Sequence, residues 1–197
     1  MKIILSLALG AILFTGCASK SNGEQNSFRL LESGITYKED TKKHDLVMLV
    51  KKPLGVGYIY NKDLVYSDEE GIYKSYVKHS WDEPLYKQLE NMLVLELNKT
   101  SMFKSVVSNG SLLKYDLVLE SNIYDFYQII DGNKSKVKVQ INLNLLNQKT
   151  KNLVDSKTFI IEKELKTITP KEALEAYNQA FAEFINQAVT WLKEQKY

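Results

Sequence analysis

The clearest pattern along the chain is an alternation of apolar and polar residues from Val137 to Leu145. Every second side chain is apolar, and lysine, glutamine or asparagine fills each gap. This period of two predicts a β-strand with one buried side and one solvent-facing side.

Two further segments extend this strand into a predicted meander. Upstream, Tyr115–Ile130 is another long β segment, and its apolar phase slips between Leu119 and Phe126, which indicates a β-bulge. Downstream, Val154–Ile161 predicts a third strand. Turn-forming residues at 131–133 and 148–152 separate the three segments and predict tight hairpin connections.

Two segments carry the spacing of an amphipathic helix. The first begins near Asp82, a predicted N-cap, with Pro84 in the first turn. Its apolar stripe comprises Leu85, Tyr86, Leu89, Met92, Leu93 and Leu97. The second helix closes the chain and is about 25 residues long, with Thr169 as cap, Pro170 at the first position and Glu172 completing a capping box. Its stripe comprises Leu174, Tyr177, Phe181, Phe184, Ile185, Ala188 and Leu192.

The first third of the chain predicts several short strands separated by polar turns. These apolar or tyrosine-rich segments are Phe28–Leu31, Asp45–Val50, Tyr58–Tyr60, Leu64–Tyr66 and Gly71–Val77. Strands and helices do not alternate regularly, and there is no internal repeat. We therefore predict an α+β fold, in which an antiparallel or mixed β-sheet packs two α-helices on one face as a two-layer sandwich.

The N-terminus predicts export and lipidation. Lys2 precedes a short apolar run, too short for a spanning helix of about 20 residues, and small residues follow. Leu13–Cys17 resembles the bacterial lipobox, in which the cysteine receives diacylglycerol; Phe14 departs from the preferred Leu, Val or Ile. We predict a signal peptide at 1–16, a lipidated Cys17 with a flexible tether at 17–27, and a single periplasmic domain at 28–197. An ordinary secretory signal with a chance cysteine is the alternative.

The residue after Cys17 is Ala18 rather than aspartate. In the lipoprotein sorting rule that this arrangement resembles, a residue other than aspartate permits transfer to the outer membrane. We therefore expect a lipid-anchored, periplasm-facing protein in the cell envelope of a Gram-negative bacterium, in the outer membrane.

Composition narrows the function classes. The 197 residues carry a net charge of +2, which argues against a nucleic-acid-binding surface. The single cysteine excludes a disulfide framework and a thiolate metal cluster. His44 and His79 have no metal-ligand spacing, and the chain has no phosphate-binding glycine loop or nucleophile elbow. We predict a protein that is not an enzyme and has no cofactor, metal or catalytic residues.

The unusual feature is a concentration of aromatic residues before the first helix. Amphipathic aromatic side chains favour protein interfaces. The candidate partner interface comprises Tyr58, Tyr60, Tyr66, Tyr73 and Trp81. The alternative is that about half of these rings pack in the core with their hydroxyls at its edge.

With these elements placed, the chain resembles the ABC-type transport auxiliary lipoprotein family, which accompanies MCE-domain lipid transport systems. The entry into the first helix, His79–Leu85, is similar to the family's "W-x-x-P-L" pattern. Phe28–Leu31, Asp116–Phe126 and the meander resemble other family segments. The segment before the first helix has fewer arginines than the family pattern. The resemblance implies no catalytic residue.

The resemblance implies a non-enzymatic accessory protein that docks to an MCE-domain periplasmic protein of a transporter between the inner and outer membranes. Two other readings stay open. One is a stand-alone lipoprotein that binds lipid or a small ligand, which a deep apolar cavity would favour. The other is a pilotin-like envelope-assembly lipoprotein. A homo-oligomer is compatible with each reading.

Overall fold

The computed structural model describes residues 26–37, 43–108 and 114–197. The predicted signal peptide and Cys17 lie outside the described residues, as does the predicted tether except for its last two residues. The described elements are β1 (Asn26–Phe28), β2 (His44–Val50), β3 (Leu54–Gly55), the 3₁₀ helix η1 (Gly57–Tyr60), β4 (Asp63–Glu69), β5 (Ile72–Trp81), α1 (Leu85–Lys99), β6 (Phe103–Ser108), β7 (Leu117–Asp131), β8 (Lys134–Asn147), β9 (Leu153–Glu164) and α2 (Pro170–Lys193).

The described strands form one mixed sheet built around β7. β8 pairs antiparallel with the whole length of β7, and β9 pairs antiparallel with β8, so the predicted meander is confirmed. Along its other edge β7 is met in turn by β2, β3 and β4, all parallel to it. β6 then extends β2, and β5 and β1 extend β4.

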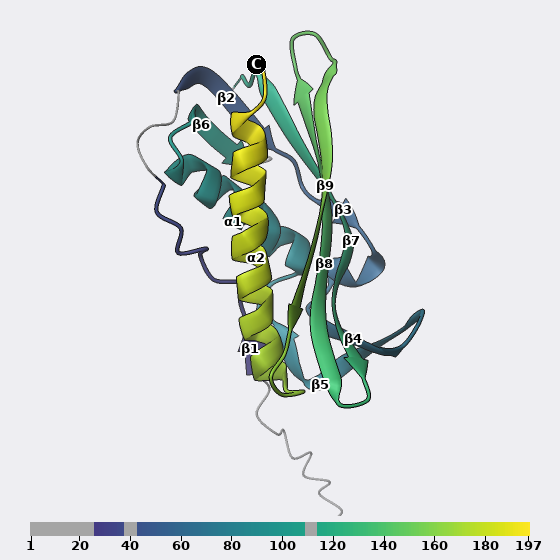
Figure 1. The fold of residues 1–197 in the computed structure, drawn as a ribbon. Coiled ribbons are helices and arrows are strands. Elements are labelled where there is room, and N and C mark those ends of the chain that lie inside the picture. The colour runs from purple at the N-terminus through teal and green to yellow at the C-terminus, as the bar shows by residue number, and fades with distance from the viewer. Residues whose placement is uncertain (1–25, 38–42, 109–113) are drawn as a thin grey trace, which may run out of the picture.

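The sheet is strongly curled. The pairing of β7 with β8 shifts register between Ile123 and Asp125, which leaves Tyr124 as an extra residue at the predicted bulge. A bulge bends its strand and increases the local twist. Both helices lie on the concave side of the sheet, α2 against β8 and β9 and α1 against β6 and η1 (Figure 1). The α+β class with a mixed sheet therefore holds, but the sheet is a half-barrel around the helices rather than the flat layer of the predicted two-layer sandwich.

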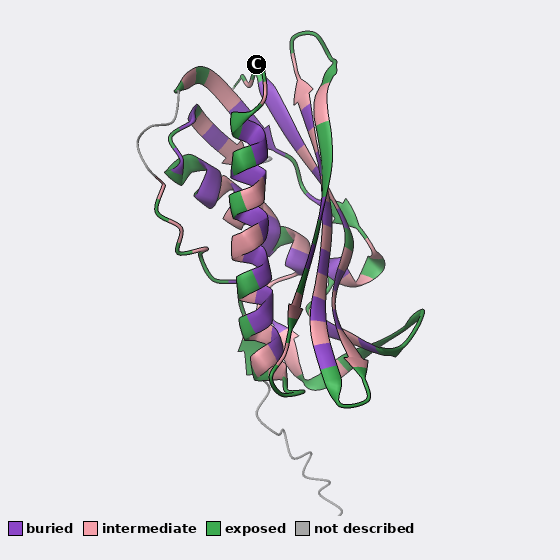
Figure 2. Ribbon diagram, viewed as in Figure 1, coloured by how far each residue is buried: buried purple, intermediate pink, exposed green. Residues whose placement is uncertain are grey.

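The core lies between the curled sheet and the inner faces of the helices (Figure 2). The five alternating apolar residues from Val137 to Leu145 are all buried, so that prediction is confirmed. On α2 the predicted stripe is buried except for the partly exposed Leu174, and the Thr169 hydroxyl accepts a hydrogen bond from the Glu172 amide at the helix start. Trp191 and Val189 widen the stripe.

The start of α1 differs from the prediction. The N-cap is Pro84, and no side chain caps the helix. The Asp82 carboxylate is instead paired with Arg29. Gln88 and Glu96 are buried although they are polar, because the segment from Leu30 to Ser33 lies across α1 and uses both side chains as hydrogen-bond acceptors.

Three other elements differ from expectation. Tyr58–Tyr60 is part of the 3₁₀ helix η1 rather than a strand. The predicted strand at 28–31 is shorter and earlier, since β1 ends at Phe28. β6 was not anticipated from the sequence; it forms the edge of the sheet beyond β2.

Candidate functional site

Trp81 does not belong to a surface. Its side chain is 2% exposed and packs edge-on against Phe126 and Tyr177, whose rings stack on each other at 4.9 Å. As the last residue of β5, it closes the core at the entry to α1. The burial of this ring leaves it little surface to offer to a partner, in contrast to the exposed Tyr73 on the same strand.

Tyr58 and Tyr73 form an aromatic cluster with Tyr127 of β7. The ring centroids are 5.7 Å apart for Tyr58–Tyr73 and 5.0 Å apart for Tyr73–Tyr127. The Phe126 amide donates to the Tyr58 hydroxyl at 3.1 Å, close to the bulge and between the points where β3 and β4 pair with β7. Burial raises the pKa of Tyr58 well above its usual range. Tyr58 is therefore structural, whereas Tyr73 is half exposed.

Tyr66 of β4 packs against Tyr76 of β5, which is hydrogen-bonded to a buried polar side chain. Its ring lies 4.8 Å from that of Tyr76, whose hydroxyl donates to the buried Gln128 side chain. Gln128 in turn donates to the Ser135 hydroxyl. Tyr66 is only partly exposed, so it offers a partner less surface than Tyr60 or Tyr73.

Tyr60 belongs to a compact exposed group that we call the Tyr60 patch, comprising Lys52, Leu54, Tyr60 and Tyr86. Leu54 is 58% and Tyr60 is 40% exposed. The Tyr60 and Tyr86 rings are 5.6 Å apart, and the Lys52 ammonium lies 4.3 Å from the Tyr86 centroid and 5.6 Å from the Tyr60 centroid. The patch thus combines exposed apolar surface with a cation held over two rings.

The loop that carries this patch is fixed from both sides. β3 pairs with β7, and the Val56 amide donates to the Ile123 carbonyl. The Gly55 amide donates to the Tyr60 hydroxyl, and Ile59 of η1 is fully buried. A β-carbon at Gly55 would lie 2.2 Å from the Ile123 carbonyl oxygen, so only glycine permits this approach. Two short elements thereby hold Leu54 and Tyr60 outward in one arrangement.

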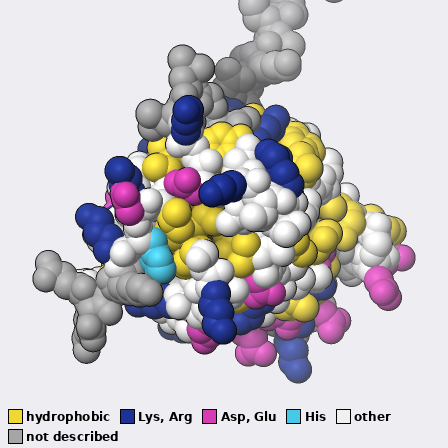
Figure 3. Space-filling view, turned by 90° about the horizontal axis from the view of Figure 1, so that it is seen from above, with side chains coloured by type: hydrophobic (Ala, Val, Ile, Leu, Met, Phe, Trp, Pro, Cys, Tyr) yellow, Lys and Arg dark blue, Asp and Glu magenta, His cyan; other side chains and the backbone are white. Residues whose placement is uncertain are grey.

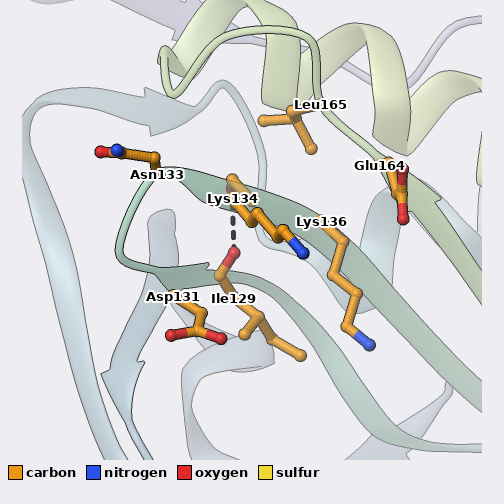
Figure 4. Close-up of a pocket in the computed structure, with 8 residues that line it drawn as sticks. Ile129, Asp131, Asn133, Lys134, Lys136, Glu164 and Leu165 are labelled. Carbon is orange, nitrogen blue, oxygen red and sulfur yellow. Dashed lines mark hydrogen bonds between the residues drawn. The ribbon is translucent and has the colours of Figure 1, made fainter.

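Two surface hollows formed by the described residues have linings that carry both charges. One, about 590 Å³, lies at the β7–β8 turn and is lined by Asp131, Lys134, Lys136 and Glu164 with apolar Ile129 and Leu165 (Figure 4). The one hydroxyl in its lining, that of Ser135, donates to the Ile129 carbonyl. A nucleophile paired with a general base is therefore missing from this lining.

The two histidines pack against aromatic rings, and an aspartate of the acidic turn is paired with a lysine. His44 packs against Phe103 and Tyr197, and His79 against Phe28 and Tyr76. In the acidic turn at 68–70, Lys74 pairs with Asp68 and holds the pKa of that carboxyl below its usual value. No group of metal-binding side chains is present among the described residues. Lysine and arginine are interspersed with aspartate and glutamate on the face shown in Figure 3.

The space between sheet and helices is filled by side chains. Buried residues from both helices and from β2, β7, β8 and β9 join in one apolar cluster, which includes Tyr177, Phe181, Phe184 and Phe159. None of the helices in the described part of the chain is long and apolar enough to cross a membrane.

The sequence does not indicate Lys52, Leu54 and Tyr127 as companions of the candidate tyrosines, and Tyr86 lies in the same concentration of aromatic residues but outside the predicted interface. Tyr86 was assigned to the apolar stripe of the first helix, and its ring is partly exposed. Lys52 and Leu54 stand in a stretch without periodicity, next to Pro53 and Gly55. The sequence signal for this patch is a loop that contains proline and glycine and also carries a lysine, an apolar residue and a tyrosine.

Comparison with known proteins places the chain by sequence and by fold. The family model described as ABC-type transport auxiliary lipoprotein component matches residues 28–189. A search of curated proteins gave no match. The crystal structure of protein XCC0632 from Xanthomonas campestris is 18% identical, with a TM-score of 0.77 over 85% of this chain and 94% of that one. Protein CT253 from Chlamydia trachomatis is 8% identical, with a TM-score of 0.51 over 76% of this chain and 96% of that one. At these identities the two structures share the fold.

Proposed function

Since the chain belongs to the ABC-type transport auxiliary lipoprotein family, we propose that it is a non-enzymatic accessory subunit of an MCE-type lipid transporter. In this proposal acylated Cys17 anchors the chain in the outer membrane, and the domain faces the periplasm and docks to the MCE-domain protein. The family match over 28–189 is the observation that carries the proposal, because it spans the strands, both helices and the Tyr60 patch.

The Tyr60 patch supports a docking role. Interfaces concentrate their affinity in a few exposed aromatic and cationic side chains on preorganised surface. Tyr60 meets this description better than the other predicted interface residues, since Trp81 is buried and Tyr58 holds the Phe126 amide. Tyr73 and Tyr66 are secondary members of the proposed surface.

A stand-alone ligand-binding role has less support. Binding sites for lipids and small molecules are concave, mostly apolar and usually preformed. In the described part of the chain the concave side of the sheet holds packed aromatic and aliphatic side chains of α2. A pilotin-like assembly role would also use an exposed surface, so binding experiments separate it from the transport role.

The experiment is a binding measurement between the full acylated chain in detergent and the periplasmic part of its cognate MCE-domain protein. Wild type is expected to bind, and Tyr60→Ala to weaken the affinity by about 30-fold, the loss of one aromatic anchor of about 2 kcal/mol. The control is Ile160→Ala, which removes an apolar side chain on β9 that is more exposed than Tyr60. Failure of wild type to bind would remove the transport proposal.

A further inference from the structure

Lys51 and Lys52 are adjacent, but Lys51 is paired with a carboxylate whereas Lys52 lies over aromatic rings. Lys51 Nζ lies 2.7 Å from the Glu120 carboxylate. Lys52 Nζ lies over the rings of Tyr86 and Tyr60, and within the described residues no carboxylate is paired with it. The two rings hold the ammonium in place without neutralising it, so it can still bind an anionic group.

The space beside Lys52 suits a side chain rather than a whole small molecule. A hollow of about 250 Å³ is lined by both lysines, Leu54, Glu120, Ser121 and Asn122. Small-molecule sites are larger, about 300–1,000 Å³. Leu54 and Tyr60 form exposed apolar surface next to this hollow. An incoming carboxylate flanked by an apolar residue would meet the cation and the apolar surface together.

We propose that the Tyr60 patch binds an extended acidic segment of the protein partner, with an Asp or Glu carboxylate on Lys52 and a neighbouring aliphatic residue on Leu54 and Tyr60. The inference rests on the proposed function and adds the chemistry of the docked segment. Charge-assisted hydrogen bonds from a lysine to a carboxylate are strongest where apolar side chains around them exclude water. The loop that carries the patch is already fixed in one conformation. Binding therefore costs little conformational entropy in this loop.

A membrane surface is a weaker occupant. Segments that bind anionic headgroups carry clusters of about 4–8 basic residues. Among the described residues the patch offers one lysine without a paired carboxylate, since Lys51 in the same hollow is paired with Glu120.

The test compares two variants with the same change in net charge, each made in the full acylated chain. Lys52→Gln should weaken binding to the periplasmic part of the cognate MCE-domain protein by about tenfold or more, the effect of removing one partner of a close charge pair. Lys51→Gln should have a clearly smaller effect, because Lys51 is already paired with Glu120 of this chain and would reach the incoming carboxylate only through the loss of that pair. Lys52→Arg should keep most of the affinity. Thermal melts show whether the variants are folded.

A substitution scan of acidic residues on the MCE-domain protein completes the test. One Asp→Asn or Glu→Gln change there should weaken binding to wild type and have no further effect with Lys52→Gln, as a double-mutant cycle requires for a direct pair. Equal effects of Lys52→Gln and Lys51→Gln would overturn the inference while the proposed function stands. Absence of binding by wild type would overturn both. Lys52-dependent binding to vesicles of phosphatidylethanolamine and phosphatidylglycerol, without a coupled acidic residue on the protein, would also overturn the inference.

Discussion

Glu96 is a carboxylate with no exposed side-chain surface, and it binds the segment from Ser33 to Tyr37 that follows β1. It accepts hydrogen bonds from the Ser33 amide and hydroxyl, from the Tyr37 hydroxyl and from Lys99 Nζ. Burial alone would raise its pKa, but the hydrogen bonds from Ser33 and Lys99 outweigh burial and leave the pKa below its ordinary value of 4.5. A charged side chain on α1 thus fixes the N-terminal segment to the domain.

Replacing this carboxylate should lower stability in a pH-dependent manner. The lowered pKa means that folding favours the ionised form, so the stabilisation is fully present above the unfolded-state pKa and is lost as the pH falls through the folded-state pKa. Glu96→Gln should lower the free energy of unfolding by about 1.5–3 kcal/mol near pH 7, the range for hydrogen bonds to charged groups. Urea unfolding from about pH 7 to about pH 3 measures this difference, which should shrink below about pH 4.5. A difference independent of pH, or an equal effect of exposed Glu175→Gln, would contradict it.

Gly55 should be intolerant of the smallest side chain. Gly55→Ala places a methyl carbon where the Ile123 carbonyl oxygen stands 2.2 Å away, so β3 must separate from β7. The expected cost is about 1–3 kcal/mol, typical of overpacking. Gly57→Ala is the matched control, since nothing lies within 4 Å of its added carbon. Thermal melts should separate the two variants, and Gly55→Ala should also weaken docking because Leu54 and Tyr60 move with the loop.

At the scale of elements, the sequence predicts a strand or helix correctly where one buried face gives the chain a regular spacing of apolar residues. β8 and α2 carry long amphipathic patterns, and their predicted buried faces are those in the structure, apart from the partly exposed Leu174. β6 has no such pattern, because it pairs only with β2 and its last residues are partly exposed on both sides. η1 contains two tyrosines that favour strands locally, but Ile59 in the core and β3 on β7 impose one helical turn instead. These differences come from tertiary contacts that local propensity does not contain.

The candidate site was only partly predictable for the same reason. The tyrosines are visible in the sequence, but their division into core, structural and exposed members depends on the helical turn η1, on the register of β4 with β5 and on the bulge in β7. Trp81 and Tyr60 illustrate the division, since one is 2% and the other 40% exposed. The burial of Gln88 and Glu96 could not be predicted either, because polar residues of an amphipathic helix are ordinarily assigned to its solvent-facing side.

α2 should be the element on which folding depends most. Phe181 is fully buried and contacts the Phe184 ring, which packs against Phe159 of β9. Phe181→Ala should cost about 3–5 kcal/mol, a large part of a total stability of about 5–15 kcal/mol. Gln179→Ala, an exposed position two residues away, should change little. A melting temperature of Phe181→Ala equal to wild type would show that the helix contributes little.

At the scale of the whole molecule, the anchor and the domain are close in sequence. β1 begins at Asn26, nine residues after Cys17, and a chain of that length spans at most about 30 Å. β1 pairs with the end of β5 that leads into α1. If Cys17 is anchored, the domain therefore stays within a short distance of the membrane. The proposed docking surface, the Tyr60 patch, would then stay within reach of the membrane as well.

Cys17 should carry the lipid. Cells given a fatty-acid analogue should label wild type but not Cys17→Ser, since the cysteine is the only thiol in the chain. Membrane fractionation of the labelled chain should recover it with the outer membrane. Equal labelling of wild type and Cys17→Ser would exclude lipidation at this residue.

Co-isolation of the acylated chain with its transporter from native membranes tests the central claim most directly. The wild-type chain, expressed at its natural level and purified through a C-terminal tag after mild cross-linking, should recover the MCE-domain protein together with its permease and ATPase. Tyr60→Ala should lose these proteins while Ile160→Ala retains them, with equal amounts of each variant in the membrane. Recovery of wild type without any MCE-domain protein, or with equal amounts for Tyr60→Ala and wild type, would contradict the account of this surface as the docking site.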